Sequence, residues 1–163
     1  MASTFSTDLK LELMATGENA GTWGTKTNTN LNLVQQAVAG YESINITATT
    51  VALAMNDGAI SQARNMILDF AGTLAGATNV TVPNSIEKMY MVKDSTTHGT
   101  STITMKTASG SGFNLSEGKV HLAYSNGTNL SNVDLSTLGG TITTASIADN
   151  AITSAKISDN QII

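Results

Sequence analysis

The glycine-rich stretch at residues 17–27 has the residue types of a phosphate-binding loop. In such a loop a lysine directly follows the second glycine, so that backbone N–H groups and the ammonium group meet the same phosphate. Here Thr25 separates Gly24 from Lys26, and Gly17 lies too far upstream. We therefore predict no nucleotide and no other cofactor in this stretch.

The other side chains that could do chemistry are scattered along the chain. The two histidines, His98 and His121, lack an acidic partner at metal-ligand spacing, so we expect both on the solvated surface. The serines lack the Gly-x-Ser-x-Gly elbow of a hydrolase. The carboxylates occur singly near turns, and a glycosidase pair would need them to converge in space. We predict no catalytic residue and no metal ligand, and hence a protein that is not an enzyme.

The composition excludes several other classes of function. A net charge of −4, with eight basic residues that form no cluster, argues against a nucleic-acid-binding surface. The absence of cysteine excludes disulfides and thiolate metal sites. No apolar run approaches the ~20 residues of a membrane-spanning helix. Charged residues make up 12% of the chain, and abundant Thr, Ser, Asn and Gly favour β-structure with many turns.

One amphipathic helix follows the glycine-rich stretch. We predict it over residues 29–39, with Asn28 or Asn30 as its N-cap and Gly40 as a left-handed C-terminal cap. Near-helical spacing gives it a narrow apolar stripe, made by Leu31, Val34, Ala37, Val38 and Tyr41.

Trp23, the single tryptophan, has two interpretations. It could anchor a partner protein, because a tryptophan in a glycine loop offers a large contact area. It could instead fill the core between helix and sheet, which we favour. We predict that residues 17–24 fold tightly, so that Trp23 wedges the helix against the β-domain or a neighbouring subunit.

After Tyr41 the hydrophobic period changes to two, which indicates strands. We predict strands at residues 66–70, 80–82, 88–93, 102–107 and 119–124, with shorter ones around Ile44 and Val51 and another at Leu9–Leu13. Pro83 should end its strand. The contiguous Met89–Val92 segment favours a strand buried on both faces, and Val120, Leu122 and Tyr124 should point into the core. The fold class is therefore mainly β: a short N-terminal helix, then an antiparallel β-sandwich or small barrel.

The C-terminal segment carries a five-residue repeat. Its isoleucines are Ile147, Ile152, Ile157 and Ile162. Neither the helix nor the strand period places these side chains on one face, so a single chain gains little by folding the repeat. Copies wound about a common axis could bury each isoleucine layer, which predicts a homo-oligomer, specifically a trimer. The alternative is a disordered tail. The chain stops inside the repeat, so we expect a longer natural protein.

Several motifs resemble one family of proteins. They are Leu-Met-Ala-Thr-Gly-Glu-Asn-Ala-Gly-Thr-Trp-Gly at residues 13–24, Thr-Asn-Thr-Asn-Leu-Asn at 27–32, Gln-Ala-Val-Ala-Gly-Tyr at 36–41 and Ala-Arg-Asn-Met-Ile-Leu-Asp-Phe-Ala-Gly-Thr at 63–73. The chain resembles the N-terminal region of virion structural proteins of tailed bacteriophages, closest to tail-fibre-like proteins of marine phages, including those of cyanobacteria. The C-terminal repeat is similar to the shaft-entry repeats of such fibres.

The resemblance implies a location in the virion, a homotrimer and docking onto another tail or capsid protein, without catalytic residues. We expect an attachment module at residues 1–41, a β-domain at 42–135 and the start of a trimeric shaft at 136–163. The expected interface residues are Trp23, Leu31, Val34, Val38 and the four repeat isoleucines. The alternatives are a capsid-decorating or head-fibre protein and a host-glycan-binding β-domain, although 4% aromatic residues offer few sugar-stacking platforms.

Overall fold

The computed structural model describes residues 2–133. The chain divides into two units, Met1–Val133 and Asp134–Ile163. The predicted fibre-like tail, with Ile147, Ile152, Ile157 and Ile162, therefore lies outside the described residues.

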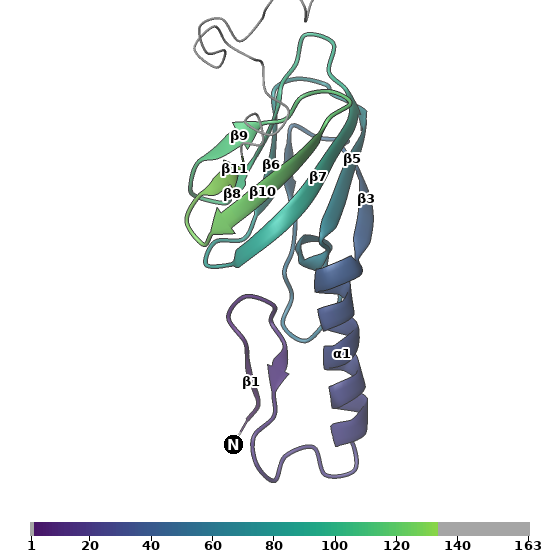
Figure 1. Ribbon diagram of the computed structural model, residues 1–163, viewed down its shortest axis with the longest axis vertical. Helices are drawn as coiled ribbons and strands as arrows, with labels where there is room; N and C mark the ends of the chain where they lie inside the picture. Colours follow the sequence, from purple (N-terminus) through teal and green to yellow (C-terminus); the bar gives the residue numbers. More distant parts are fainter. Residues whose placement is uncertain (1, 134–163) are drawn as a thin grey trace, which may run out of the picture. The chain divides into compact units, whose positions relative to one another are not determined.

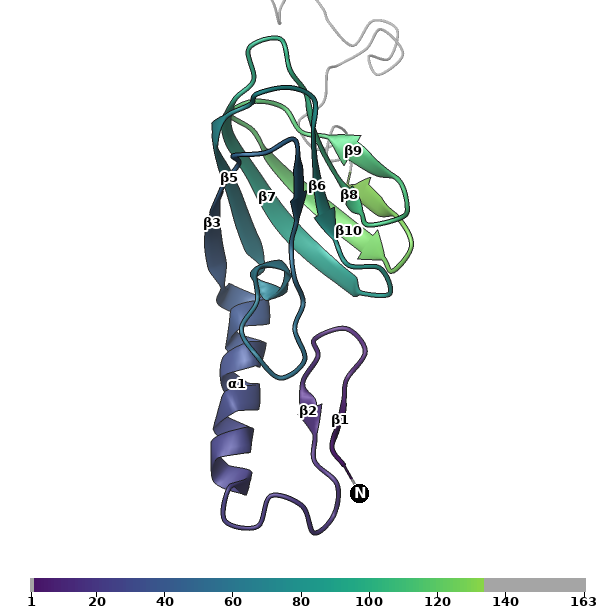
Figure 2. The same cartoon turned by 180° about the vertical axis from the view of Figure 1, so that it is seen from behind.

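Two β-sheets face each other in the described unit (Figures 1 and 2). The five-stranded sheet has the order β11-β10-β7-β5-β3, and the four-stranded sheet has the order β4-β6-β8-β9. The first contains β3 (Tyr41–Asn45), β5 (Ile67–Thr73), β7 (Glu87–Thr97), β10 (Val120–Asn126) and β11 (Leu130–Asn132). The second contains β4 (Thr50–Ala52), β6 (Thr78–Val82), β8 (Ile103–Thr107) and β9 (Gly112–Asn114). The strands predicted within these two sheets are thus present, and β6 ends just before Pro83 as expected. Of the strand predicted at Leu9–Leu13, only Glu12 and Leu13 belong to a strand.

The expectation of an antiparallel fold was wrong, because both sheets are mixed. Strand β5 pairs in parallel with β3 and with β7, and β6 pairs in parallel with β4 and with β8. Parallel neighbours need a long crossover, usually a helix. Here the chain alternates between the sheets from β3 to β8, so a strand of one sheet serves as the crossover of the other. Strands β9, β10 and β11 then add antiparallel pairs.

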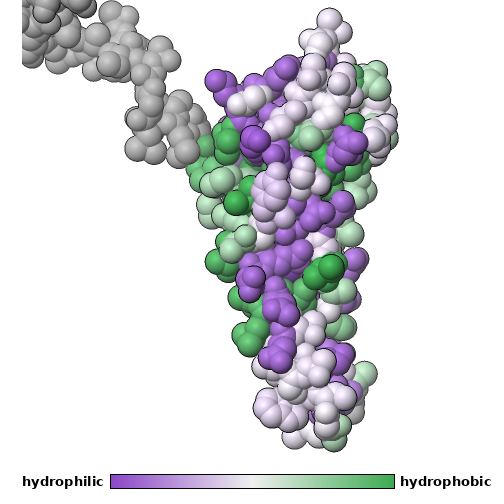
Figure 3. Space-filling model, turned by 90° about the vertical axis from the view of Figure 1, so that its right-hand side faces the viewer, coloured by the Kyte–Doolittle hydropathy of each residue, from purple (hydrophilic) through white to green (hydrophobic). Residues whose placement is uncertain are grey.

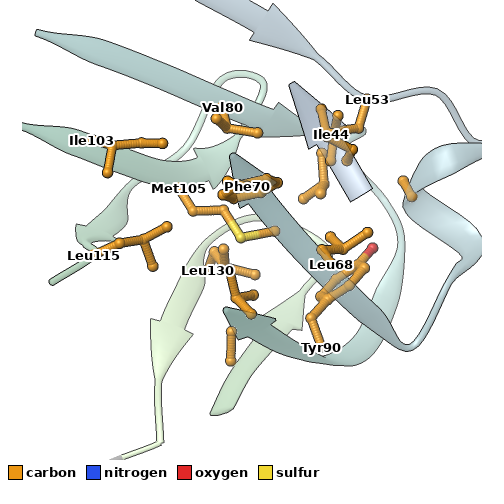
Figure 4. Close-up of a cluster of buried hydrophobic side chains, with 14 of the residues drawn as sticks. Ile44, Leu53, Leu68, Phe70, Val80, Tyr90, Ile103, Met105, Leu115 and Leu130 are labelled. Atoms are coloured by element: carbon orange, nitrogen blue, oxygen red, sulfur yellow. The ribbon is translucent and has the colours of Figure 1, made fainter. Parts of the chain in front are cut away.

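The core lies between the two sheets (Figure 4). Its buried side chains from the five-stranded sheet include Leu68, Phe70, Tyr90 and Val92, and those from the four-stranded sheet include Val80, Val82, Ile103 and Met105. Strand β7 alternates strictly between exposed and buried residues. The prediction that Met89–Val92 is buried on both faces was therefore wrong: Tyr90 and Val92 point inward, and Met89 and Met91 point outward.

Strand β10 is also turned opposite to its predicted orientation. Ala123 and Ser125 are buried, whereas Val120 and Tyr124 are exposed and Leu122 is half-buried. The sequence pattern favoured the larger apolar residues for the core, but pairing with β7 places Leu122 beside the outward Met91. The small Ala123 instead lies beside Tyr90, whose ring occupies the interior.

Helix α1 (Trp23–Ala39) begins earlier than predicted. Thr22, and neither Asn28 nor Asn30, occupies the N-cap position. Gly40 does not form a left-handed cap: its φ of −70° and ψ of 140° already belong to the extended chain that enters β3. A glycine is needed there for space, because a Cβ would meet the Gln36 carbonyl oxygen and the Asn65 side chain, each at 2.3 Å.

A short hairpin of β1 (Thr4–Phe5) and β2 (Glu12–Leu13) precedes the helix. Arg64 is the last residue of the 3₁₀ turn η1 (Gln62–Arg64) and is buried. Its guanidinium group connects the hairpin loop to the β-domain. Its Nε donates to the Leu9 carbonyl oxygen at 2.9 Å, and its Nη2 donates to the Asn56 carbonyl oxygen at 2.6 Å. Burial lowers the pKa of Arg64, while the nearby Asp57 carboxylate opposes that shift.

Candidate functional site

Three apolar side chains of α1 form an exposed row, here called the helix stripe. Leu31, Val34 and Val38 are 61%, 36% and 71% exposed, respectively. The predicted single stripe is in fact divided. Ala37, together with Leu33, faces the protein interior, while the helix stripe remains uncovered in the single chain.

Another face of the helix contacts the β1–β2 hairpin, which explains this orientation. The Asn30 side chain forms two hydrogen bonds with the Glu12 backbone, as a neighbouring strand would. Its Oδ1 accepts from the Glu12 N–H at 3.0 Å, and its Nδ2 donates to the Glu12 carbonyl oxygen at 2.8 Å. Lys26 pairs with the Glu12 carboxylate at 2.9 Å, and that contact lowers the pKa of Glu12. Lys26, Asn30, Leu33 and Ala37 share one side, and each stripe residue lies one position further, about 100° around the axis.

The helix stripe has the spacing of a coiled-coil seam. Leu31 and Val34 are three residues apart, Val34 and Val38 four, and Val38 and Tyr41 three again. Within the helix, this spacing assigns Leu31 and Val38 to a positions and Val34 to a d position of a heptad. Tyr41 is 56% exposed, but it is the first residue of β3 and has no heptad position. The seam therefore ends with the helix, two residues before the sheet begins.

The favoured prediction, that Trp23 fills the core, was wrong. It is the first residue of α1 and is 65% exposed. Gly17 and Gly21 adopt left-handed φ values of 84° and 78° and form the turns before the helix, whereas Gly24 already belongs to it. The Trp23 indole is thus presented outward at the start of α1, which leaves contact with a partner protein or with a neighbouring subunit as the prediction.

Both histidines were predicted on the solvated surface, but each is partly buried and hydrogen-bonded. His98 Nε2 lies 2.7 Å from Oδ2 of the buried Asp94. His121 is half-buried, stacks at a tilt against Phe113 and accepts a hydrogen bond from the Ser116 N–H at 3.1 Å. Asp94 also accepts from the Thr96 hydroxyl at 2.6 Å, so this group locks the end of β7. Among residues 2–133, no three His, Asp or Glu side chains gather in a way that could hold a metal ion.

The burial of Lys88 was not predicted from the sequence. Lys88 Nζ donates to the carbonyl oxygens of Asn65 at 3.2 Å and Met89 at 3.0 Å, and it lies 4.5 Å from the centre of the Tyr90 ring. Burial lowers the pKa of Lys88 to about 8 and raises that of Tyr90. The strand alternation that places Tyr90 inward also places Lys88 inward, so this signal could have found it.

A hollow beside the β1–β2 loop holds no recognisable reaction centre. Its volume is about 490 Å³, and it lies where the β1–β2 loop approaches two turns of the β-domain. Its carboxylates are Asp8 and Glu87, and Asp8 Oδ1 already accepts from the Glu87 N–H at 2.8 Å. The lining contains no cation, and it has no histidine to activate its hydroxyl groups. The arrangement supports an open polar surface rather than catalysis.

Comparison of the chain with protein-family models, curated protein sequences and solved structures gave no match. None of the helices described within residues 2–133 is long and apolar enough to cross a membrane. The helix stripe is the surface feature on which the proposed function rests.

Proposed function

We propose that this chain is a non-enzymatic structural protein that assembles as a homotrimer and anchors a fibre of a tailed-phage virion. The exposed heptad row of Leu31, Val34 and Val38 carries the proposal. An apolar seam with this spacing is buried when parallel helices of identical chains pack together. The resemblance of the N-terminal motifs to tail-fibre-like proteins supports the location in the virion.

One layer of the seam has residue types that favour more than two copies. Parallel dimers prefer a β-branched residue at a and leucine at d, whereas leucine at a with isoleucine at d shifts the preference toward trimers and tetramers. Leu31 at a with Val34 at d is similar to the second pattern, while Val38, the other a residue, is β-branched. A threefold axis would also bring together three equivalent C-terminal repeats, as the isoleucine spacing predicts.

The proposed activity is attachment through many weak contacts. Three linked copies present three identical docking sites at once, and the effective concentration of the second and third sites raises the total affinity. The exposed Trp23 at the start of each helix offers one such contact with a tail or baseplate protein.

Native mass spectrometry of the full chain tests the assembly. We expect three times the mass of the chain, and a Val34→Glu variant should shift the population to single chains, because three carboxylates would meet at the axis. Ile60→Glu is the matched control, since Ile60 is 77% exposed but lies outside the seam. A parent chain that remains a monomer at micromolar concentration would contradict the proposal.

Labelled antibodies against the chain, applied to phage particles that carry it, test its location on the tail.

A further inference from the structure

The outer face of the five-stranded sheet carries a group of exposed apolar side chains beside a polar row that contains Asp69 and Lys93. Its residues, here called the sheet patch, come from β5, β7 and β10: Ile67, Met89, Met91, Val120, Leu122 and Tyr124. Val120 is 60% exposed, and Met89, Met91 and Tyr124 are each at least 40% exposed. Contiguous apolar patches on a protein surface often mark sites of interaction with another molecule.

The register of the strands makes the patch contiguous. Tyr41 pairs with Ile67, Ile67 with Met91, and Met91 with Leu122, so one row crosses four strands. Tyr124 lies beside Met89 in the same pairing of β7 with β10. Because neighbouring strands are about 4.8 Å apart, side chains in such a row touch.

The four-stranded sheet provides an internal comparison. Its outward positions pair Thr50 with Asn79, Asn79 with Thr104, and Thr104 with Asn114. That outer face is polar, as expected for one that stays in water. The two sheets therefore differ in these outward rows: the row across the five-stranded sheet is apolar, and the row across the four-stranded sheet is polar.

The sheet patch begins close to the end of the helix that carries the helix stripe. Tyr41 follows α1 after the extended Gly40 and is the first member of the row across the sheet. Figure 3 shows hydrophobic side chains along one margin, from the level of the sheets to that of the helix, beside a hydrophilic band.

The charges beside the row suit contact between identical faces. Asp69 and Lys93 pair with each other at 3.0 Å, and the Tyr41 hydroxyl donates to Asp69 at 2.9 Å. Burial by itself would raise the pKa of Asp69, but hydrogen bonds from Ser95, Lys93 and Tyr41 outweigh it and lower that pKa. A pair that is neutralised within one copy brings no net like charge to a symmetry axis.

The length of α1 shows why the sheet is needed. The helix has 17 residues, which is about two heptads, whereas sustained coiled coils extend over at least three or four. The seam alone is short for a stable trimer. The sheet patch supplies further apolar area.

We propose that the sheet patch is the second half of the homotrimer interface, buried against the sheet patches of two other copies of this chain. This inference rests on the proposed homotrimer and specifies its partner surface. It makes α1 and the five-stranded sheet one continuous contact around the axis.

The cysteine-free chain allows a direct test by cross-linking. Single-cysteine variants Met91→Cys, Val38→Cys and Ile60→Cys are treated as full chains with a short bis-maleimide and separated under denaturing conditions. We expect covalent dimers for Met91→Cys and Val38→Cys and none above background for Ile60→Cys, which is exposed but lies on neither surface.

The outcomes separate this inference from the proposed function. If Val38→Cys cross-links and Met91→Cys does not, the sheet patch is excluded while the helix seam stands. If Ile60→Cys reacts as readily as Met91→Cys, the inference also fails, because the contact is not specific. A monomeric mass without any cross-link overturns both proposals.

A charge substitution supplies an independent measurement. Met91→Glu should raise the protein concentration at which the trimer dissociates by at least about tenfold, because like charges would face one another. Ile60→Glu should leave that concentration unchanged. Equal dissociation of the parent and Met91→Glu would overturn the inference.

Discussion

At the scale of single residues, two cationic side chains of this domain lie in unusual places. Arg64 and Lys88 are both buried and are hydrogen-bonded chiefly to backbone carbonyl oxygens rather than to carboxylates. Arg64 remains charged, because its ordinary pKa lies far above neutrality. Lys88 differs, since its pKa near 8 brings its titration within an accessible range.

The free energy of unfolding should therefore rise with pH above about 8. Lys88 binds its proton less tightly in the folded protein, with a pKa of about 8, than in the unfolded chain, where the ordinary value is 10.5. Below pH 8 both states are protonated and the folded state bears the cost of burying the charge. Between about pH 8 and 10 the unfolded chain binds more protons, so the gain approaches about 2 kcal/mol.

Urea denaturation at about pH 7 and 9.5, at a dilution where the chain is monomeric, measures this gain. The control is Lys88→Met, whose stability should be nearly independent of pH over the same range. The raised pKa of Tyr90 acts in the opposite direction above about pH 10, so the range stops below it. A parent slope that persists in Lys88→Met would assign the effect to another group.

At the scale of elements, helix α1 has one face covered by the chain itself and one face that is exposed. Leu33 and Ala37 are buried against the rest of the chain, whereas Leu31, Val34 and Val38 are exposed. Both sets have helical spacing. Only the contacts of Asn30 with Glu12 and of Gln36 with Ser61 show which set the chain itself covers.

Alanine substitutions on the two faces should have different effects. Leu33→Ala should lower the free energy of unfolding by about 2–5 kcal/mol, because it leaves a cavity in a covered site. Val38→Ala should change the unfolding of the monomeric chain by less than about 0.5 kcal/mol, as is usual at the surface. It should nevertheless weaken the trimer.

Urea denaturation at high dilution and native mass spectrometry at micromolar concentration measure these effects separately. Equal destabilisation of the monomer by both variants would contradict the division of the helix into a folding face and an assembly face.

At the scale of the whole molecule, stability should depend on protein concentration. The proposed association through the helix stripe and the sheet patch would stabilise the folded state by mass action, so the thermal midpoint should rise as the chain is concentrated. Scanning calorimetry over a hundredfold range of concentration tests this expectation. The same series with Met91→Glu should show a smaller rise, and an unchanged midpoint for the parent would contradict self-association.

The described unit also shows how parallel sheets form without intervening helices. Each of the three strand pairs from β3 to β8 contributes one strand to each sheet. The period-two pattern located most of these strands, because alternation of inward and outward residues depends on neighbouring positions alone. Parallel pairing depends on the path of the chain between strands, and that path leaves no local signature.

By itself, the sequence determined the β-rich character, the presence of one helix before the strands and the end of β6 at Pro83, since propensity, period and proline act locally. Only the tertiary structure decided which apolar residues are covered. Val120, Leu122 and Tyr124 have the pattern of core residues yet lie outside, and Trp23 lies outside although its size favours burial. A side chain is buried by what packs against it, and an apolar surface kept for another copy looks the same in sequence as one kept for the core.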